Sequence, residues 1–128
     1  MKRTMRIAIS ITLLVAIISI ASADMLSDPV FDSASTNLNS TKIAVFNAAT
    51  ISPAENIKIT KVRLYQKVGT VWYYAGSLPV PTTEATNAFT YSATYDYSSY
   101  IGDGTYRLYT TFSADGYTIS RFSNTRTY

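Results

Sequence analysis

The sequence predicts an all-β protein, an antiparallel β-sandwich of six or seven strands. From Asp24 onward the chain is rich in Thr, Tyr, Val and Ser and poor in Leu and Ala, a composition that favours strands over helices. No 11-residue window keeps its apolar residues at helical spacing, so we expect little or no helix after the N-terminal segment. Turn signals recur roughly every 8 to 15 residues, which is typical of two-sheet sandwiches.

Residues 1–23 have the three parts of a secretory signal peptide and predict a signal-peptide helix before the sandwich. The basic start MKRTMR is followed by an apolar run of 14 residues, 7–20, and by an A-x-A cleavage site that ends at Ala23. A membrane-spanning helix needs about 20 apolar residues, so a retained anchor is the weaker alternative. We expect a protein that is secreted or associated with the cell envelope and does not contact the membrane after cleavage.

The mature chain forms one domain, with a polar lead-in at 24–40 and the sandwich at 41–128. There is no Cys, so the core must be stable without disulfides. Three of the 11 Lys and Arg residues lie in the signal peptide, which leaves 8 against 8 Asp and Glu and a formal charge of zero. Without a net positive field a nucleic-acid partner is not expected.

The first strands are expected at 41–50 and 57–68, separated by the breaker sequence SPAEN. In the first, Ile43 and Val45 share one face and Phe46 takes the other. In the second, the apolar positions change parity, because Ile57 and Ile59 are odd whereas Val62 and Leu64 are even. A continuous strand therefore needs a β-bulge between Thr60 and Lys61; otherwise the main strand begins at Lys61.

The remaining strands follow from turn signals and alternation. A turn at Val68–Thr70 leads to a strand at 71–78, and the Pro- and Thr-rich segment 79–87 predicts a loop that changes sheets. Strands are then expected at 88–95 and 105–114, with an Asp-Gly hairpin turn before the last one. We expect eight of the apolar side chains in the core: Ile43, Val45, Val62, Leu64, Phe89, Tyr91, Leu108 and Phe112.

The segment DGTYRL, residues 103–108, predicts a structural corner. Asp103 and Gly104 turn the chain, and a buried tyrosine at 106 needs a nearby partner for its hydroxyl. The segment resembles the tyrosine corner of immunoglobulin-like and fibronectin-III-like sandwiches, in which Leu108 would occupy the place of the second core cysteine. The resemblance implies that Tyr106 bonds back to the backbone and that Trp72 is the packed core tryptophan.

A broader resemblance covers Ile57 to Ser123. Behind an export signal, the chain shows ITKVRLYQKVGTVW, then FTYSATY, then GTYRLYTTFSADG. This arrangement is similar to small secreted proteins of Gram-positive bacteria that share an uncharacterised domain of unknown function. The resemblance implies a bacterial, exported β-domain and supplies no catalytic or binding residues.

The residue types argue against an enzyme. The chain has neither His nor Cys, which excludes the common nucleophilic triads, zinc sites and thiol redox chemistry. Asp96 and Asp103 flank one loop and are candidates for a Ca²⁺ site, but turn hydrogen bonds and solvent account for them more simply. We therefore expect no catalytic residues, no metal and no cofactor.

The tyrosines provide the candidate binding surface. Tyr73 lies in VWYYAG, and Tyr95, Tyr97 and Tyr100 gather before the corner. Exposed aromatic rings bind protein or glycan surfaces at low entropic cost, although tyrosines also pair across strands without any ligand. We expect a non-catalytic binding or interaction module; the alternatives are a carbohydrate-binding module and a surface subunit that self-assembles through an unpaired final strand.

Overall fold

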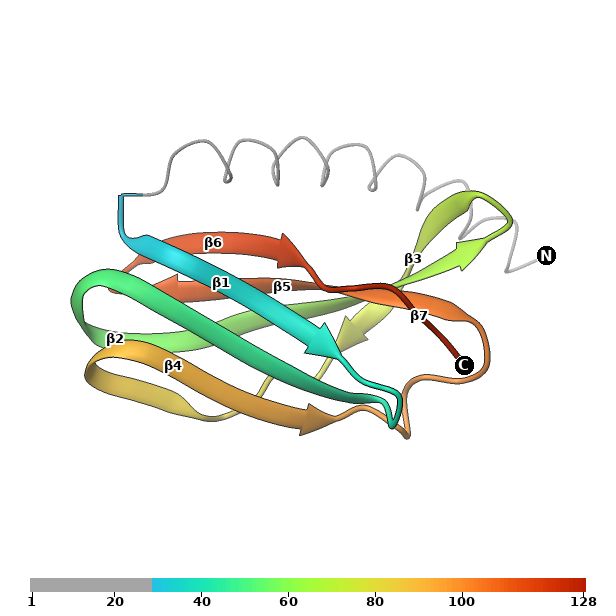
Figure 1. Cartoon of the computed structure of the whole chain (residues 1–128), viewed down its shortest axis with the longest axis horizontal. Helices are drawn as coiled ribbons and strands as arrows, with labels where there is room; N and C mark the ends of the chain where they lie inside the picture. The colour runs from blue at the N-terminus through green and yellow to red at the C-terminus, as the bar shows by residue number, and fades with distance from the viewer. Residues whose placement is uncertain (1–28) are drawn as a thin grey trace.

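The computed structural model describes residues 29–128, and within these residues the chain is all-β and antiparallel, as predicted (Figure 1). No helix in this part of the chain is long and apolar enough to cross a membrane. The predicted signal peptide, 1–23, lies outside the described residues. The seven strands are β1 (Phe31–Leu38), β2 (Ile43–Val68), β3 (Val71–Leu78), β4 (Glu84–Asp96), β5 (Thr105–Ala114), β6 (Tyr117–Phe122) and β7 (Arg126–Thr127).

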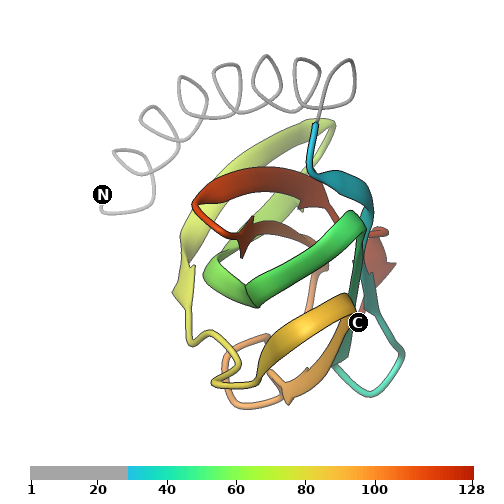
Figure 2. The same cartoon turned by 90° about the vertical axis from the view of Figure 1, so that its left-hand side faces the viewer.

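Strand β2 is 26 residues long and takes part in both layers of the sandwich. Its first part, before the bend, pairs with β1 and β4. Its second part pairs first with the beginning of β4, at Glu84–Ala88, and then with β3 and β5. Strand β6 and the short β7 extend the second layer beyond β5. Because β2 turns back at one end of the molecule, all seven strands form one hydrogen-bonded sheet folded over on itself, and Figure 2 looks onto that bend.

These pairings are those of an immunoglobulin-like sandwich in which the second and third strands are fused into β2. Strand β5 then corresponds to the strand that carries the tyrosine corner, and β3 extends its sheet as an additional edge strand. The hairpin of β2 and β3 therefore lies within one layer and does not join the two layers. Trp72, on β3, is not the packed core tryptophan, and this prediction was wrong.

The bend of β2 lies where the sequence predicts a break between two strands. The segment SPAEN does not end the strand; Thr50 to Pro53 instead lie opposite the single β4 residue Phe89, and these extra residues bend the strand. The β5–β6 turn secures the bend. The Asp115 carboxylate accepts hydrogen bonds from the backbone amides of Glu55 (3.1 Å) and Asn56 (3.0 Å), and the Asp115 amide donates to the Asn56 carbonyl.

Of the two alternatives for the second part of β2, the structure has the continuous strand with a bulge. The pairing of β2 with β5 shifts between Ile59 and Lys61, so Thr60 is the extra residue. Ile59 and Val62 are both buried as a result. The parity change in the sequence thus located the bulge to within one residue.

Three of the eight predicted core residues do not lie in the core. Ile43 and Val45 are only partly buried, because Phe46, flanked by alanines at 44 and 48, faces the interior instead. This part of the strand has apolar residues on both faces, so alternation alone does not predict which face points into the core. Phe89 is 53% exposed because the alternation of β4 is interrupted opposite the β2 bend, next to Asn87 with φ of 49°. The other five predicted core residues are buried.

The polar lead-in, which was predicted to precede the sandwich, contributes β1. Phe31, Thr36 and Leu38 are buried, and the Thr36 hydroxyl donates to the Thr110 hydroxyl of the opposite layer at 3.0 Å. The side-chain amide of Asn124 also accepts from the Leu38 amide (2.7 Å) and donates to the Leu38 carbonyl (2.9 Å). The sandwich therefore begins before Thr41, and polar contacts join its two layers.

Replacing Asp115 tests how much the turn stabilises the bend. Asp115→Asn keeps a side chain that tolerates the positive φ of 50° at this site but removes one acceptor oxygen. We expect the free energy of unfolding to fall by about 1 kcal/mol, measured by urea denaturation. The control is Asp32→Asn, which makes the same chemical change at an exposed position of β1. Equal urea midpoints of unfolding for the two variants would contradict the role of Asp115.

Candidate functional site

The described residues contain a second apolar cluster, on the outer side of the layer formed by β3, β2, β5 and β6. Tyr65 (0% exposed) and Tyr109 (4% exposed) are its buried centre. We call this surface the outer aromatic face; its remaining rings are those of Trp72, Tyr74 and Phe122, which are partly buried against the two tyrosines. Side chains alternate along a strand, so the neighbours Leu64 and Leu108 point into the main core.

The tripeptide Arg-Leu-Tyr occurs twice and explains this face. Residues 63–65 of β2 pair antiparallel with residues 107–109 of β5, so that each arginine lies opposite the tyrosine of the other strand. The two leucines, also opposite one another, fill the core. The same short sequence therefore builds part of the interior and part of the outer surface.

The rings of the outer aromatic face contact one another edge to face. The Tyr65 ring centroid lies 5.6 Å from that of Tyr74, 6.4 Å from that of Tyr109 and 5.7 Å from that of Phe122. Tyr109 and Phe122 are closer, at 4.6 Å. Such tilted contacts match the quadrupoles of the rings and fix their orientation.

Arg107 lies between two of these rings. Its guanidinium carbon is 4.2 Å from the Trp72 ring centroid and 3.9 Å from that of Phe122, which are cation–π distances. Its Nε is buried and has no hydrogen-bond partner. Burial lowers the pKa of this guanidinium, and the nearby Tyr65 partly opposes the shift; arginine nevertheless stays charged at neutral pH.

Further cations lie around Arg107. The Lys67 ammonium is 6.0 Å from the Trp72 ring centroid, and Arg63 lies close enough to the Tyr65 hydroxyl to oppose the rise in the pKa of that phenol, whose main cause is burial. Lys61 and Arg63 are both outward positions of β2, since Val62 and Leu64 are buried. No Asp or Glu occurs in residues 59–68 or in β3, β5 or β6.

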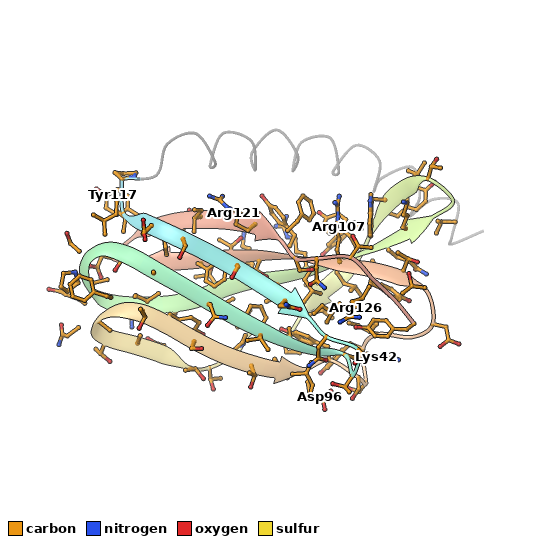
Figure 3. The ribbon with its side chains drawn as sticks, viewed as in Figure 1. Lys42, Asp96, Arg107, Tyr117, Arg121 and Arg126 are labelled. Carbon is orange, nitrogen blue, oxygen red and sulfur yellow. The ribbon has the colours of Figure 1, made fainter. Side chains whose placement is uncertain are left out.

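Figure 3 shows where several charged side chains lie. Arg107 and Arg121 lie on the side of the molecule formed by β5 and β6, whereas Asp96, at the end of β4, lies on the opposite side together with Lys42. The acidic residues of the described chain lie at strand ends, in turns and in the β2 bend. Residues 24–128 have no net formal charge, but their charges are unevenly distributed.

The predicted corner has the expected hydrogen bond. The Tyr106 hydroxyl donates to the Asp103 carbonyl at 3.1 Å, and Leu108 is fully buried. Gly104 has φ of 138°, a backbone conformation that L side chains rarely adopt, so glycine is strongly favoured there. Backbone hydrogen bonds in both directions join Gly104 to Tyr128. Asp103, Gly104, Tyr106 and Leu108 therefore support the β5 end of the outer aromatic face.

The candidate surface of four tyrosines is only partly assembled. Tyr95 stacks on Tyr97 at 4.5 Å, and Tyr100 contacts Tyr97 edge to face at 6.3 Å. Tyr97, however, is fully buried and donates to the Pro79 carbonyl at 2.7 Å, and burial raises the pKa of its phenol. Tyr100 is 49% exposed. Tyr73 lies apart, on β3 opposite Gln66.

Alternation placed one aromatic of VWYY at the surface, but sequence reasoning did not identify the outer aromatic face. The sequence did contain a signal for this face, the repeated Arg-Leu-Tyr. In this tripeptide, large side chains point to both faces of the strand. A strand with one solvent-exposed face normally alternates apolar with polar residues. Tyr65, Arg107, Tyr109 and Phe122 were missed because the pairing of β2 with β5 and β6 that brings them together is not local.

Two of the described carboxylates, Asp96 and Asp115, accept hydrogen bonds from nearby backbone amides. Asp96 accepts from the Ser98 amide at 2.9 Å, and hydrogen bonds from Ser98 lower the pKa of its carboxyl. Residues 29–128 contain no group of three acidic side chains placed to hold a metal ion. A shallow pocket lies at the β2 bend, but its carboxylate is Asp115, which already accepts from two backbone amides.

The sequence matches no protein-family model and no curated protein. The geometry of the outer aromatic face is therefore the basis for assigning a function.

Tyr106→Phe tests the corner. Loss of a partly buried hydrogen bond should lower the free energy of unfolding by about 1 kcal/mol, measured by chemical denaturation. Tyr100→Phe, at a half-exposed tyrosine, is the matched control and should change it by less than about 0.5 kcal/mol. If Tyr106→Phe leaves the unfolding midpoint unchanged, its hydroxyl does not stabilise the turn.

Proposed function

We propose that the chain is an exported, non-catalytic binding module that acts at the cell envelope or outside the cell, with the outer aromatic face as its contact surface. The supporting observation is that Trp72, Arg107 and several tyrosines gather on the solvent side of a sheet, apart from the main core. Trp, Tyr and Arg are the residues that contribute most to binding at protein surfaces. The signal-like N-terminus and the resemblance to small secreted bacterial proteins agree with export.

The order within the face also supports binding. Ring–ring and cation–π contacts hold Arg107 in place before any partner arrives. A preorganised surface loses less conformational entropy on association. Either a protein or a glycan fits such a surface.

Self-assembly as a surface subunit is the second candidate, and a different region favours it. Ile51, Phe89 and Tyr117 are each more than half exposed, and all three lie at the end of the molecule where β2 and β4 bend. Large exposed apolar side chains in one region often mark a protein contact. Sedimentation over a range of concentrations distinguishes assembly of the chain from binding to another molecule.

The proposed function is tested by binding the labelled protein to arrays of polysaccharides and envelope proteins. We expect saturable binding that Trp72→Ser abolishes, because it removes one of the two rings that hold Arg107. Tyr117→Ser, which removes an exposed aromatic at the other end of the sheet, is the matched control and should bind normally. Binding unaffected by Trp72→Ser, or turnover of a glycan or peptide by the purified protein, would contradict the proposal.

A further inference from the structure

We infer that the ligand of the outer aromatic face is an acidic polysaccharide, a chain of sugars that bears carboxylate or phosphate groups. The inference rests on the proposed function and specifies its ligand. The observation behind it is charge complementarity: four cations lie on this face, and no carboxylate is present in the strand segments that form it. The four are Lys61, Arg63, Lys67 and Arg107.

Arg107 is the centre of this site. It is a partly buried cation without a carboxylate partner, and its Nε has no hydrogen-bond acceptor. A buried charge is normally paired, so an external anion would supply the interaction that the chain itself does not. The guanidinium group binds carboxylate and phosphate through paired N–H donors, which suits either kind of acidic sugar.

The spacing of the cations fits an extended ligand. Arg63 and Lys67 are four residues apart on β2, about 13 Å at the usual rise of a strand. Arg107 lies between them on the neighbouring strand, opposite Tyr65. The cations therefore follow the strand direction across an open sheet face, so a polymer with acid groups along its length can contact several of them together.

The groups between and around the cations favour sugars over a protein partner. Hydroxyl pairs lie on the same outer side, Thr111 with Ser120 and Thr105 with Thr127, each at 2.9 Å. Lys and Ser are depleted in the centres of protein–protein interfaces. The rings of the face are partly buried, which leaves limited apolar area for a protein partner.

A membrane surface is a weaker fit. Binding to an anionic bilayer is strengthened by apolar side chains that enter it, and Ile51, Phe89 and Tyr117 lie at the bend, away from the cations. Among the described residues, the only large apolar side chain near the cationic face that is more than half exposed is Val68, at the β2–β3 turn.

The test is equilibrium binding of the full-length chain, exported from a bacterial host and purified, to three soluble polymers and to phosphatidylglycerol vesicles. Polygalacturonate carries carboxylates, phosphomannan carries phosphates, and dextran is neutral. We expect binding to one or both acidic polymers, no measurable binding to dextran, and weaker binding as salt is raised from 20 to 300 mM. The preferred acidic polymer distinguishes carboxylate from phosphate recognition.

Charge-neutralising variants locate the site. Arg107→Gln and Lys67→Gln should each weaken binding by about tenfold. Lys67 is exposed, so Lys67→Gln remains informative if Arg107→Gln fails to fold. Lys58→Gln is the control: it removes the same charge from an exposed position of β2 that lies opposite Glu84, and should change the affinity by less than twofold.

Several outcomes would overturn the inference. Equal binding to dextran, equal loss in Lys58→Gln, or binding only to phosphatidylglycerol vesicles would each exclude an acidic polysaccharide at this face. The arrays could instead show binding to a protein or a neutral glycan, and Trp72→Ser could abolish that binding. In that case the proposed binding function stands and only the inferred ligand class is wrong. If no polymer and no array component binds, the proposed function fails together with the inference.

Discussion

The bend of β2 is the constraint on which the rest of the structure depends. One strand supplies the centre of both layers, so the position of the bend decides which residues face the core on each side. The Asp115 carboxylate holds the bend from the β5–β6 turn, and the bulge at Thr60 restores the inward direction of Val62 and Leu64. Together these features set the register in which β2 meets β5.

That register creates the outer aromatic face. Once the two Arg-Leu-Tyr segments are aligned antiparallel, the leucines join the core, and the arginines and tyrosines are left on the outside. A one-residue slip would reverse every side chain of the pair, placing two arginines in the core. The energetic need to keep these cations out of the interior therefore stabilises the same register that forms the proposed binding surface.

The sequence was sufficient where the signal was local. The strand class, the bulge at Thr60, the Asp115–Gly116 hairpin and the Tyr106 corner all follow from parity or turn chemistry. It was insufficient where apolar residues occupy both faces of a strand, as around Phe46, or where a bend interrupts alternation, as at Phe89. The outer aromatic face was missed for a related reason: long-range strand pairing brings its rings together, and Tyr97, one of the predicted surface tyrosines, is buried in the core.

Trp72 is the only tryptophan of the chain and part of the outer aromatic face, so its fluorescence tests the central claim most directly. The protein is titrated with polygalacturonate or phosphomannan while co-sedimentation measures the bound fraction. If the polymer binds this face, Trp72 emission should change saturably and in proportion to the bound fraction. Binding by co-sedimentation without any change in Trp72 emission would place the ligand elsewhere and contradict the claim.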